Sequence, residues 1–153
     1  MKTYSAKPRD ITRQWYLIDA ADAPLGRVAT KAASLLLGKL KPSLTPHIDG
    51  GDFVVIINAQ QLIVTGNKLA NKKYYRHSGF PGGLRTSSLG EELQHDPSQV
   101  IIRAIRNMLP DNKLRAGRLS RLKVYVDSQH NHDAQQPISV NLGKKGGQNN
   151  DNR

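Results

Sequence analysis

The sequence contains no cysteine, so it can form neither a disulfide framework nor a thiolate metal site. Aromatic residues are few, with one Trp, five Tyr and two Phe, so the core must be mainly aliphatic. No apolar run approaches the roughly 18 residues that span a bilayer. The N-terminal segment MKTYSAKPRDITRQW lacks the apolar stretch of a secretion signal. These absences predict a soluble intracellular protein without a membrane partner.

Acidic residues are also scarce. Twelve Asp and Glu stand against 23 Lys and Arg, which gives a net charge of +11 in 153 residues. A small domain needs far less charge to stay soluble, and self-repulsion at this level costs stability. We therefore expect a polyanionic partner. Nucleic acid is favoured over an anionic membrane surface, because no basic helix has a strongly apolar opposite face.

The positive charge is concentrated in two segments that contain no acid at all. Residues 53–90 contain Lys68, Lys72, Lys73, Arg76 and Arg85. Residues 112–126 contain Lys113, Arg115, Arg118, Arg121 and Lys123. A purely solvated surface normally mixes both signs. The two segments therefore predict two contacts with a phosphate backbone, with binding that weakens steeply as salt rises.

Hydrophobic patterning predicts an α/β fold. The unbroken β-branched run FVVII at 53–57 is typical of a strand covered on both faces. Apolar residues at three- and four-residue spacing predict a helix over 25–37, and the sequence DPSQ at 96–99 predicts the start of another. Further expected elements are strands at 15–18, 62–64 and 122–126, a hairpin at 72–89 and a short helix at 114–119. Strand, helix and strand in succession predict a right-handed crossover.

The segment KKYYRHSGFPGG at 72–83 places two tyrosines where burial looks unfavourable. Either at least one ring of Tyr74 and Tyr75 packs within the hairpin, or a ring lies with Arg76 against sugars or unpaired bases. Glycine at 79, 82 and 83 fits the second interpretation, since bare backbone can approach a phosphate closely. A basic projecting hairpin is suited to insertion into folded RNA.

No catalytic or metal-binding motif is complete. The sequence GNK at 66–68 lacks the preceding spaced glycine and the following Ser or Thr of a phosphate loop, and GKKGG at 143–147 lies in a polar tail. The segment HNHD at 130–133 has no second cluster at ligand spacing. Asp49 and Asp52 are interpreted as turn and capping residues in preference to a catalytic pair. We expect no enzyme activity, no cofactor and no small-molecule substrate.

Several segments together resemble the bacterial form of one family, the thirteenth protein of the large ribosomal subunit. The matching segments, in family order, are 15–20, 25–27, 45–47, 51–59, 65–68, 74–79, 81–83, 108–110, 122–125, 130–132 and 134–137. Two departures are the sequence at 115–118, where the Gly-Arg pair comes late, and the extra tail beyond Asn141.

The resemblance implies a three-layer α/β/α sandwich with a small, mostly parallel sheet. It also implies a structural, non-enzymatic role in the cytoplasmic ribosome, where the protein binds large-subunit ribosomal RNA beside neighbouring ribosomal proteins and supports early assembly. The expected organisation is a basic arm at 1–14, one RNA-binding domain at 15–137 and a polar, disordered tail at 138–153. The alternatives are a free RNA-binding regulator and a nucleotide-using enzyme.

Charge and resemblance together define a set of candidate RNA contacts. They are Arg27, Lys39, Lys41, Lys68, Lys72, Lys73, Tyr74, Tyr75, Arg76, His77, Gly82, Gly83, Arg85, Lys113, Arg115, Arg118, Arg121 and Lys123.

Overall fold

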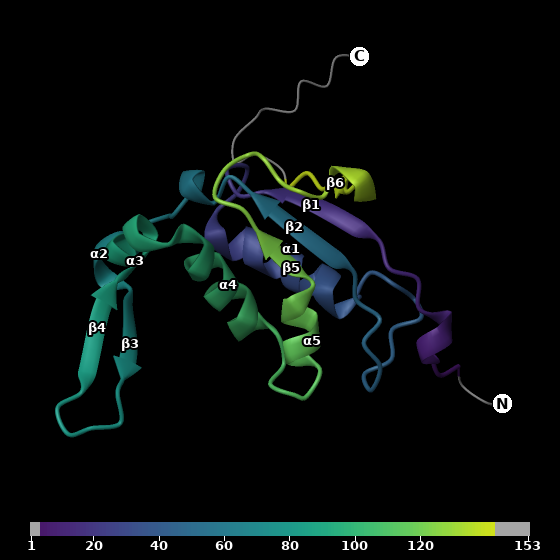
Figure 1. Ribbon diagram of the computed structural model, residues 1–153, viewed down its shortest axis with the longest axis horizontal. Coiled ribbons are helices and arrows are strands. Elements are labelled where there is room, and N and C mark those ends of the chain that lie inside the picture. The colour runs from purple at the N-terminus through teal and green to yellow at the C-terminus, as the bar shows by residue number, and fades with distance from the viewer. Residues whose placement is uncertain (1–3, 143–153) are drawn as a thin grey trace, which may run out of the picture.

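The main sheet of the protein has four parallel strands. The structure is a computed structural model that describes residues 4–142. The strands are β1 (Trp15–Asp19), β2 (Phe53–Ile57), β5 (Leu122–Val124) and β6 (Ile138–Ser139), in the spatial order β5-β2-β1-β6 (Figure 1). Each pair runs parallel, with Trp15 beside Phe53 and Val54 beside Leu122. The predicted α/β class and parallel sheet are confirmed.

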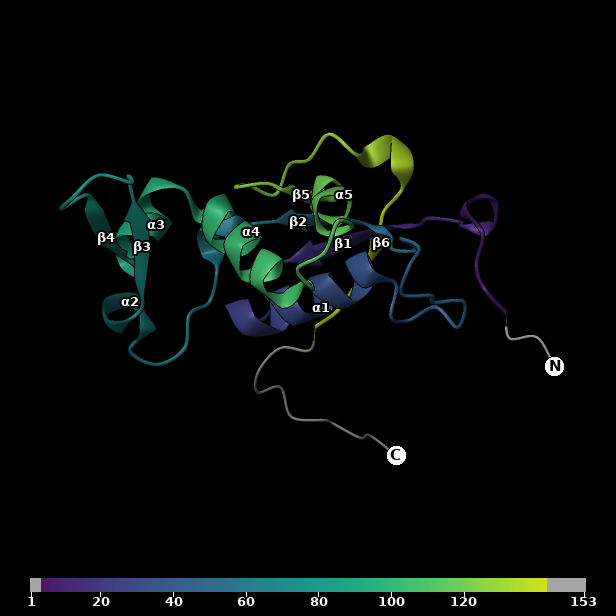
Figure 2. The same cartoon turned by 90° about the horizontal axis from the view of Figure 1, so that it is seen from below.

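Two helices cover one face of this sheet. They are α1 (Leu25–Leu37) and α4 (Pro97–Met108), which pack against each other (Figure 2). The fully buried side chains between helices and sheet are aliphatic, as the composition predicts. They include Ile18, Val28, Leu35, Leu36, Val54, Ile56, Ile101 and Ile105. Burying one such side chain stabilises the fold by about 1.5–3 kcal/mol.

The opposite face is covered by chain that is mostly irregular. The rings of Trp15 and Phe53 stack on this face, with centroids 4.3 Å apart and planes at 6°. His132 lies against Trp15 with its ring centroid 4.8 Å away. It belongs to the 125–137 segment, whose only helical turn is η3 (Asp133–Gln135). The cover on this face therefore consists mainly of loop, with one 3-10 turn.

A second unit projects from the side of the sheet. It consists of α2 (Lys68–Asn71), the antiparallel hairpin of β3 (Lys73–His77) and β4 (Leu84–Ser88), and α3 (Leu89–His95). Figure 1 shows this hairpin at the far end of the molecule from the N-terminal segment, which contains η1 (Pro8–Asp10). The predicted projecting hairpin is confirmed.

Two boundaries differ from the expectation. Residues 62–64 form no strand, because only an isolated bridge joins Ile63 to Pro24, and the preceding turn is η2 (Ala59–Gln61). The structured chain also continues past 137, since β6 pairs with β1 and both Val140 and Leu142 pack on the core. The rest of the predicted tail, 143–153, lies outside the described residues.

Helix α3 begins with a reciprocal cap that fixes the end of β4. The Ser88 hydroxyl accepts from the backbone N–H of Glu91 at 3.3 Å, and the Glu91 carboxylate accepts from the N–H of Ser88 at 2.9 Å. Ser88→Ala removes one half of this box, so we expect the free energy of unfolding to fall by about 0.5–2 kcal/mol. Thermal unfolding should show a melting point several degrees lower, whereas Ser43→Ala in an exposed loop should leave it unchanged. Equal melting points for the two variants would contradict the assignment.

Candidate nucleic-acid interface

The hairpin presents its charge in an arrangement that is unfavourable in the free protein. Arg76 on β3 lies directly opposite Arg85 on β4, and both side chains are exposed. Like charges at opposed positions of an antiparallel pair destabilise it. Neither guanidinium forms an ion pair among the described residues. Such a pair is suited to an anion that lies between or across the two strands.

The structure assigns different surroundings to the two tyrosines. The Tyr74 ring is half-buried and lies near two cations, with the Arg103 guanidinium of α4 5.2 Å and the Lys72 ammonium 5.5 Å from its centroid. Burial raises the pKa of Tyr74, and the nearby Glu92 charge adds to this effect while Arg103 opposes it. Tyr75 points to the other side of the strand and is 67% exposed. Tyr74 therefore packs within the unit, and Tyr75 is the ring available for stacking.

The tip of the hairpin holds an aromatic side chain that the candidate list omitted. Phe80 is 75% exposed, and it lies between Gly79 and Gly82, which have φ of 90° and 71°. These left-handed conformations favour glycine and make the tight return of the chain possible. A side chain at Gly83 would collide with the Ser78 hydroxyl, so this glycine serves the turn itself. The sequence did contain a signal for Phe80, because a large aromatic residue between turn glycines has no core within reach.

Two of the five cations in the second acid-free segment are paired with one carboxylate from elsewhere in the chain, that of Asp49. The guanidinium of Arg121 is buried and donates through Nη2 to Asp49 at 2.7 Å, with Nη1 bonded to the same carboxylate. Arg118 is only 3% exposed, and its Nε lies 3.5 Å from Asp49. Arg118 lies in the last turn of α5 (Arg115–Ser120), the predicted short helix, and Arg121 is the residue that follows this helix. Burial leaves these two arginines a structural role and removes them from the accessible surface.

Two more candidate cations are also paired. Arg115 lies 2.6 Å from Asp111, which is itself exposed. Lys41 is half-buried and bridges Asp52 at 2.6 Å and two backbone carbonyls, those of Thr12 and Gly50. Asp49 and Asp52 are thus counter-ions with different partners, which does not fit a catalytic pair.

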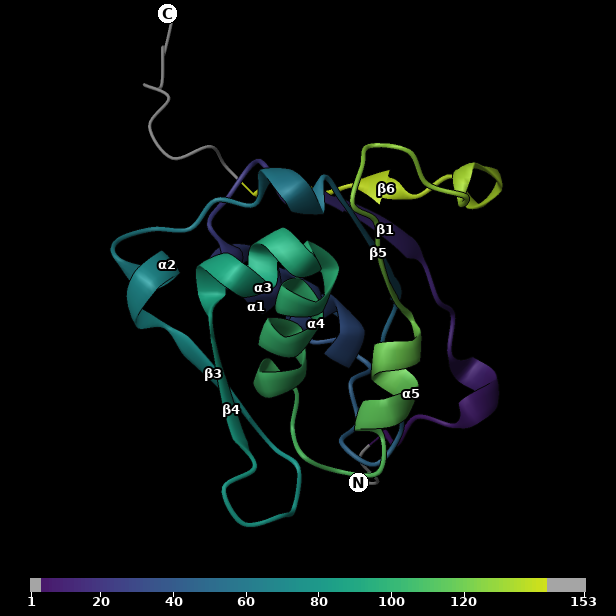
Figure 3. The ribbon, with the colours of Figure 1, turned by 60° about the vertical axis from the view of Figure 1, so that its left-hand side comes forward.

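The remaining candidate cations lie on the surface with no ion pair among residues 4–142. They are Arg27, Lys39, Lys68, Lys72, Lys73, Lys113 and Lys123, together with the hairpin arginines. Figures 1 and 3 show that the hairpin tip, the 109–114 connection and the 39–50 loop extend in the same direction from the sheet. The described residues contain no cluster of three or more His, Asp or Glu able to hold a metal ion. Within the same residues, no helix is long and apolar enough to cross a membrane.

The sequence profile of the family described as ribosomal protein L13 matches residues 13–131. The chain belongs to the ribosomal protein L13 family. Two curated proteins named large ribosomal subunit protein uL13 illustrate the similarity. The one from Mycobacteroides abscessus is 56% identical over 142 residues, which cover 93% of this chain and 97% of the relative. The one from Kocuria rhizophila is 54% identical over 137 residues, covering 90% and 93%.

Membership of the L13 family confirms the resemblance found in the sequence. It is a family of ribosomal structural proteins, so the chain is not an enzyme. A third relative, uL13 from Chromohalobacter salexigens, is 51% identical, and the match covers 100% of the relative and 93% of this chain. The hairpin and the parallel strands β1, β2 and β5 fall inside the family match, so the exposed cations described above belong to the shared domain.

Proposed function

We propose that the protein is a structural constituent of the large ribosomal subunit, in the cytoplasm, and that it binds large-subunit ribosomal RNA. The names of its relatives support this role. The observation that carries the RNA-binding part is the exposed pair of Arg76 and Arg85 on opposed strands, because an anion relieves their repulsion. A net charge of +11 supports the same conclusion.

The proposed interface is the side of the sheet toward which the hairpin tip, the 109–114 connection and the 39–50 loop extend (Figures 1 and 3). Arg76, Arg85 and Lys73 bind phosphates, and Tyr75 and Phe80 are exposed rings that can stack on sugars or unpaired bases. The exposed hairpin residues His77 and Gly82 stay in this proposed surface. The cations left out of it are Arg118, Arg121, Lys41 and Arg115, since their partners are Asp49, Asp52 and Asp111.

The mechanism that this surface supports is electrostatic and geometric. Phosphate contacts fix the position of a protein on RNA and carry little sequence information. A rigid sheet with a basic hairpin projecting from one side can hold together RNA segments that otherwise repel each other. The protein then stabilises the RNA fold from an early stage of assembly, with neighbouring ribosomal proteins joining later.

Sedimentation of a cell lysate tests this proposal. We expect the protein in the large-subunit fraction of a sucrose gradient at both low and high salt, because an interface enclosed by RNA is less screened than a surface contact. It should also occur in slower-sedimenting large-subunit precursors, as an early-binding protein does. Mass spectrometry follows the chain across the gradient. Recovery at the top of the gradient, or release at modest salt, would favour a free RNA-binding regulator.

A further inference from the structure

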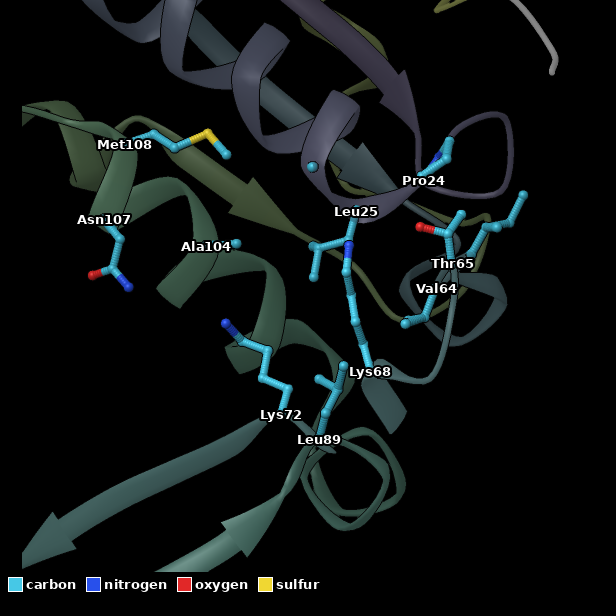
Figure 4. A pocket seen from close by; sticks show the side chains of 12 residues that line it. Pro24, Leu25, Val64, Thr65, Lys68, Lys72, Leu89, Ala104, Asn107 and Met108 are labelled. Carbon is cyan, nitrogen blue, oxygen red and sulfur yellow. The ribbon is translucent and has the colours of Figure 1, made fainter. Parts of the chain in front are cut away.

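A pocket of about 350 Å³ lies where the hairpin unit joins the sheet (Figure 4). Its volume is at the lower end of the range, about 300–1,000 Å³, for pockets that enclose a small molecule. The floor is apolar and includes Leu25 at the start of α1, Leu89 at the start of α3 and Ala104 of α4. Met108, at the end of α4, is 42% exposed and forms part of the wall. Apolar side chains exposed in a concave site indicate that something covers them.

The polar side chains of the pocket indicate the charge of its occupant. Lys68 and Lys72 extend from the α2 side toward α1 and α4 (Figure 4), and no carboxylate contributes to the lining. Neither ammonium has an acidic partner among residues 4–142. Asn107 and Thr65 add neutral groups that donate and accept hydrogen bonds. The occupant is therefore apolar in one part and anionic in another.

A second hollow of about 390 Å³ continues the first one along α2. The two share Thr65, Lys68 and Lys72, and the second is completed by Gly66, Asn67 and Asn71. The side chains that line the first hollow are mostly apolar, those that line only the second belong to polar residues and glycine, and the two lysines contribute to both. This succession matches the parts of one nucleotide, whose base is a flat ring and whose phosphate continues into a charged backbone.

We infer that the apolar pocket holds the base of one unpaired nucleotide of ribosomal RNA, with the flanking phosphates bound by Lys68 and Lys72, whose side chains extend toward α1 and α4 beside it (Figure 4). Loops and bulges of RNA present such bases without breaking a pair, so extrusion costs least there. An apolar side chain of a neighbouring protein is the alternative occupant, and it is disfavoured because that protein would also have to place a carboxylate beside two unpaired lysines, whereas every nucleotide brings a phosphate. The inference rests on the proposed function, since it needs the protein on RNA.

Photo-cross-linking from Met108 tests the inference. The chain contains only two methionines, Met1 and Met108, so replacing methionine by photo-methionine places a single photoreactive group at the pocket and one at the N-terminus. The labelled full-length chain is incorporated into large subunits and irradiated, and mass spectrometry identifies what is joined to the Met108 peptide. A labelled Met108→Leu variant measures the background from Met1. We expect one RNA nucleotide on the Met108 peptide and loss of that product in the Met108→Leu variant.

Three other results would overturn the inference. A cross-link from Met108 to a peptide of another protein identifies a protein occupant. No product above the Met108→Leu background shows a solvent-filled pocket. An undiminished nucleotide cross-link in the Lys68→Gln/Lys72→Gln double variant shows that the lysines do not hold the phosphates. Sedimentation of the same labelled chain with the large subunit is measured separately, so a failure of the pocket assignment is distinguishable from a failure of the proposed function.

Discussion

Asp49→Ala is expected to lower the free energy of unfolding by about 3–5 kcal/mol, because it leaves buried guanidinium charge without a counter-ion. Arg121 is 6% and Arg118 3% exposed, and both lie against the Asp49 carboxylate. Natural domains are stable by only about 5–15 kcal/mol, so this single change removes a large part of the total. Urea unfolding of the free, full-length protein measures the effect.

Asp111→Ala is the matched control for this prediction. It also removes an aspartate from an arginine, but Asp111 is 85% exposed and its partner Arg115 can turn to solvent. An exposed ion pair of this kind contributes about 0–1 kcal/mol. If the two variants lost similar stability, the Asp49 cluster would be an ordinary surface ion pair and its structural role would be refuted.

The same cluster predicts how stability depends on pH. Burial by itself raises the pKa of Asp49, but the hydrogen bond and charge of Arg121, with the charge of Arg118, hold it below the ordinary value of 3.8. A carboxylate with a depressed folded-state pKa contributes its stability in full above the unfolded-state value and loses it as pH falls toward the folded-state value. Wild-type protein should therefore lose this contribution only below about pH 4. The difference in stability between wild type and Asp49→Ala should shrink over that acidic range and stay constant above it.

Local patterns in the sequence predicted the elements of the fold well. The three- and four-residue spacing over 25–37 predicted α1, and the proline after Asp96 predicted the start of α4. Asp96 caps α4 by accepting from the backbone N–H groups of Ser98 and Gln99. The β-branched run at 53–57 became a central strand of the sheet. These signals are local because the hydrogen bonds and caps that define them join residues close in sequence.

What the sequence did not reveal depends on contacts between distant residues. Asp49 and Arg121 are 72 residues apart, so the acid-free appearance of 112–126 concealed a buried ion pair. Strand β6 has only two residues and is a strand only because it pairs with β1. The polar residues around it gave no sign of this pairing in the sequence. Likewise, the layer over Trp15 and Phe53 depends on His132, which lies in an irregular loop without periodicity. A run of positive charge in a sequence therefore identifies a binding surface only after the cations that form ion pairs inside the protein have been left out.

Reversing charge on the hairpin separates RNA binding from folding. In the Lys73→Glu/Arg76→Glu variant, the carboxylate introduced at position 76 lies opposite Arg85, so a like cross-strand pair becomes an unlike one, and Lys73 lies opposite the neutral Ser88. Because unlike cross-strand pairs stabilise a hairpin by about 0.2–1 kcal/mol, we expect the free protein to be at least as stable as wild type. Urea unfolding of the free variant checks this expectation, so that loss of RNA binding can be separated from unfolding.

The expected binding result is a weaker complex with a shallower dependence on salt. Losing two phosphate contacts should reduce the slope of log K against log salt by about 2, and repulsion between the new carboxylates and RNA should lower the affinity further. Filter binding to large-subunit ribosomal RNA over a salt series measures both quantities. Incorporation into large subunits, measured by sedimentation, should fall in parallel.

Lys31→Glu/Arg106→Glu supplies the matched control, because it makes the same change in net charge on α1 and α4, outside both acid-free segments. If the affinity for RNA depends only on the net charge of the protein, the two double variants will weaken binding equally, and the hairpin will not be a specific contact. If the hairpin is the contact, its variant alone will show the reduced slope. The opposed arginines then have their explanation in the RNA, since the bound phosphates offset a repulsion that the free protein tolerates.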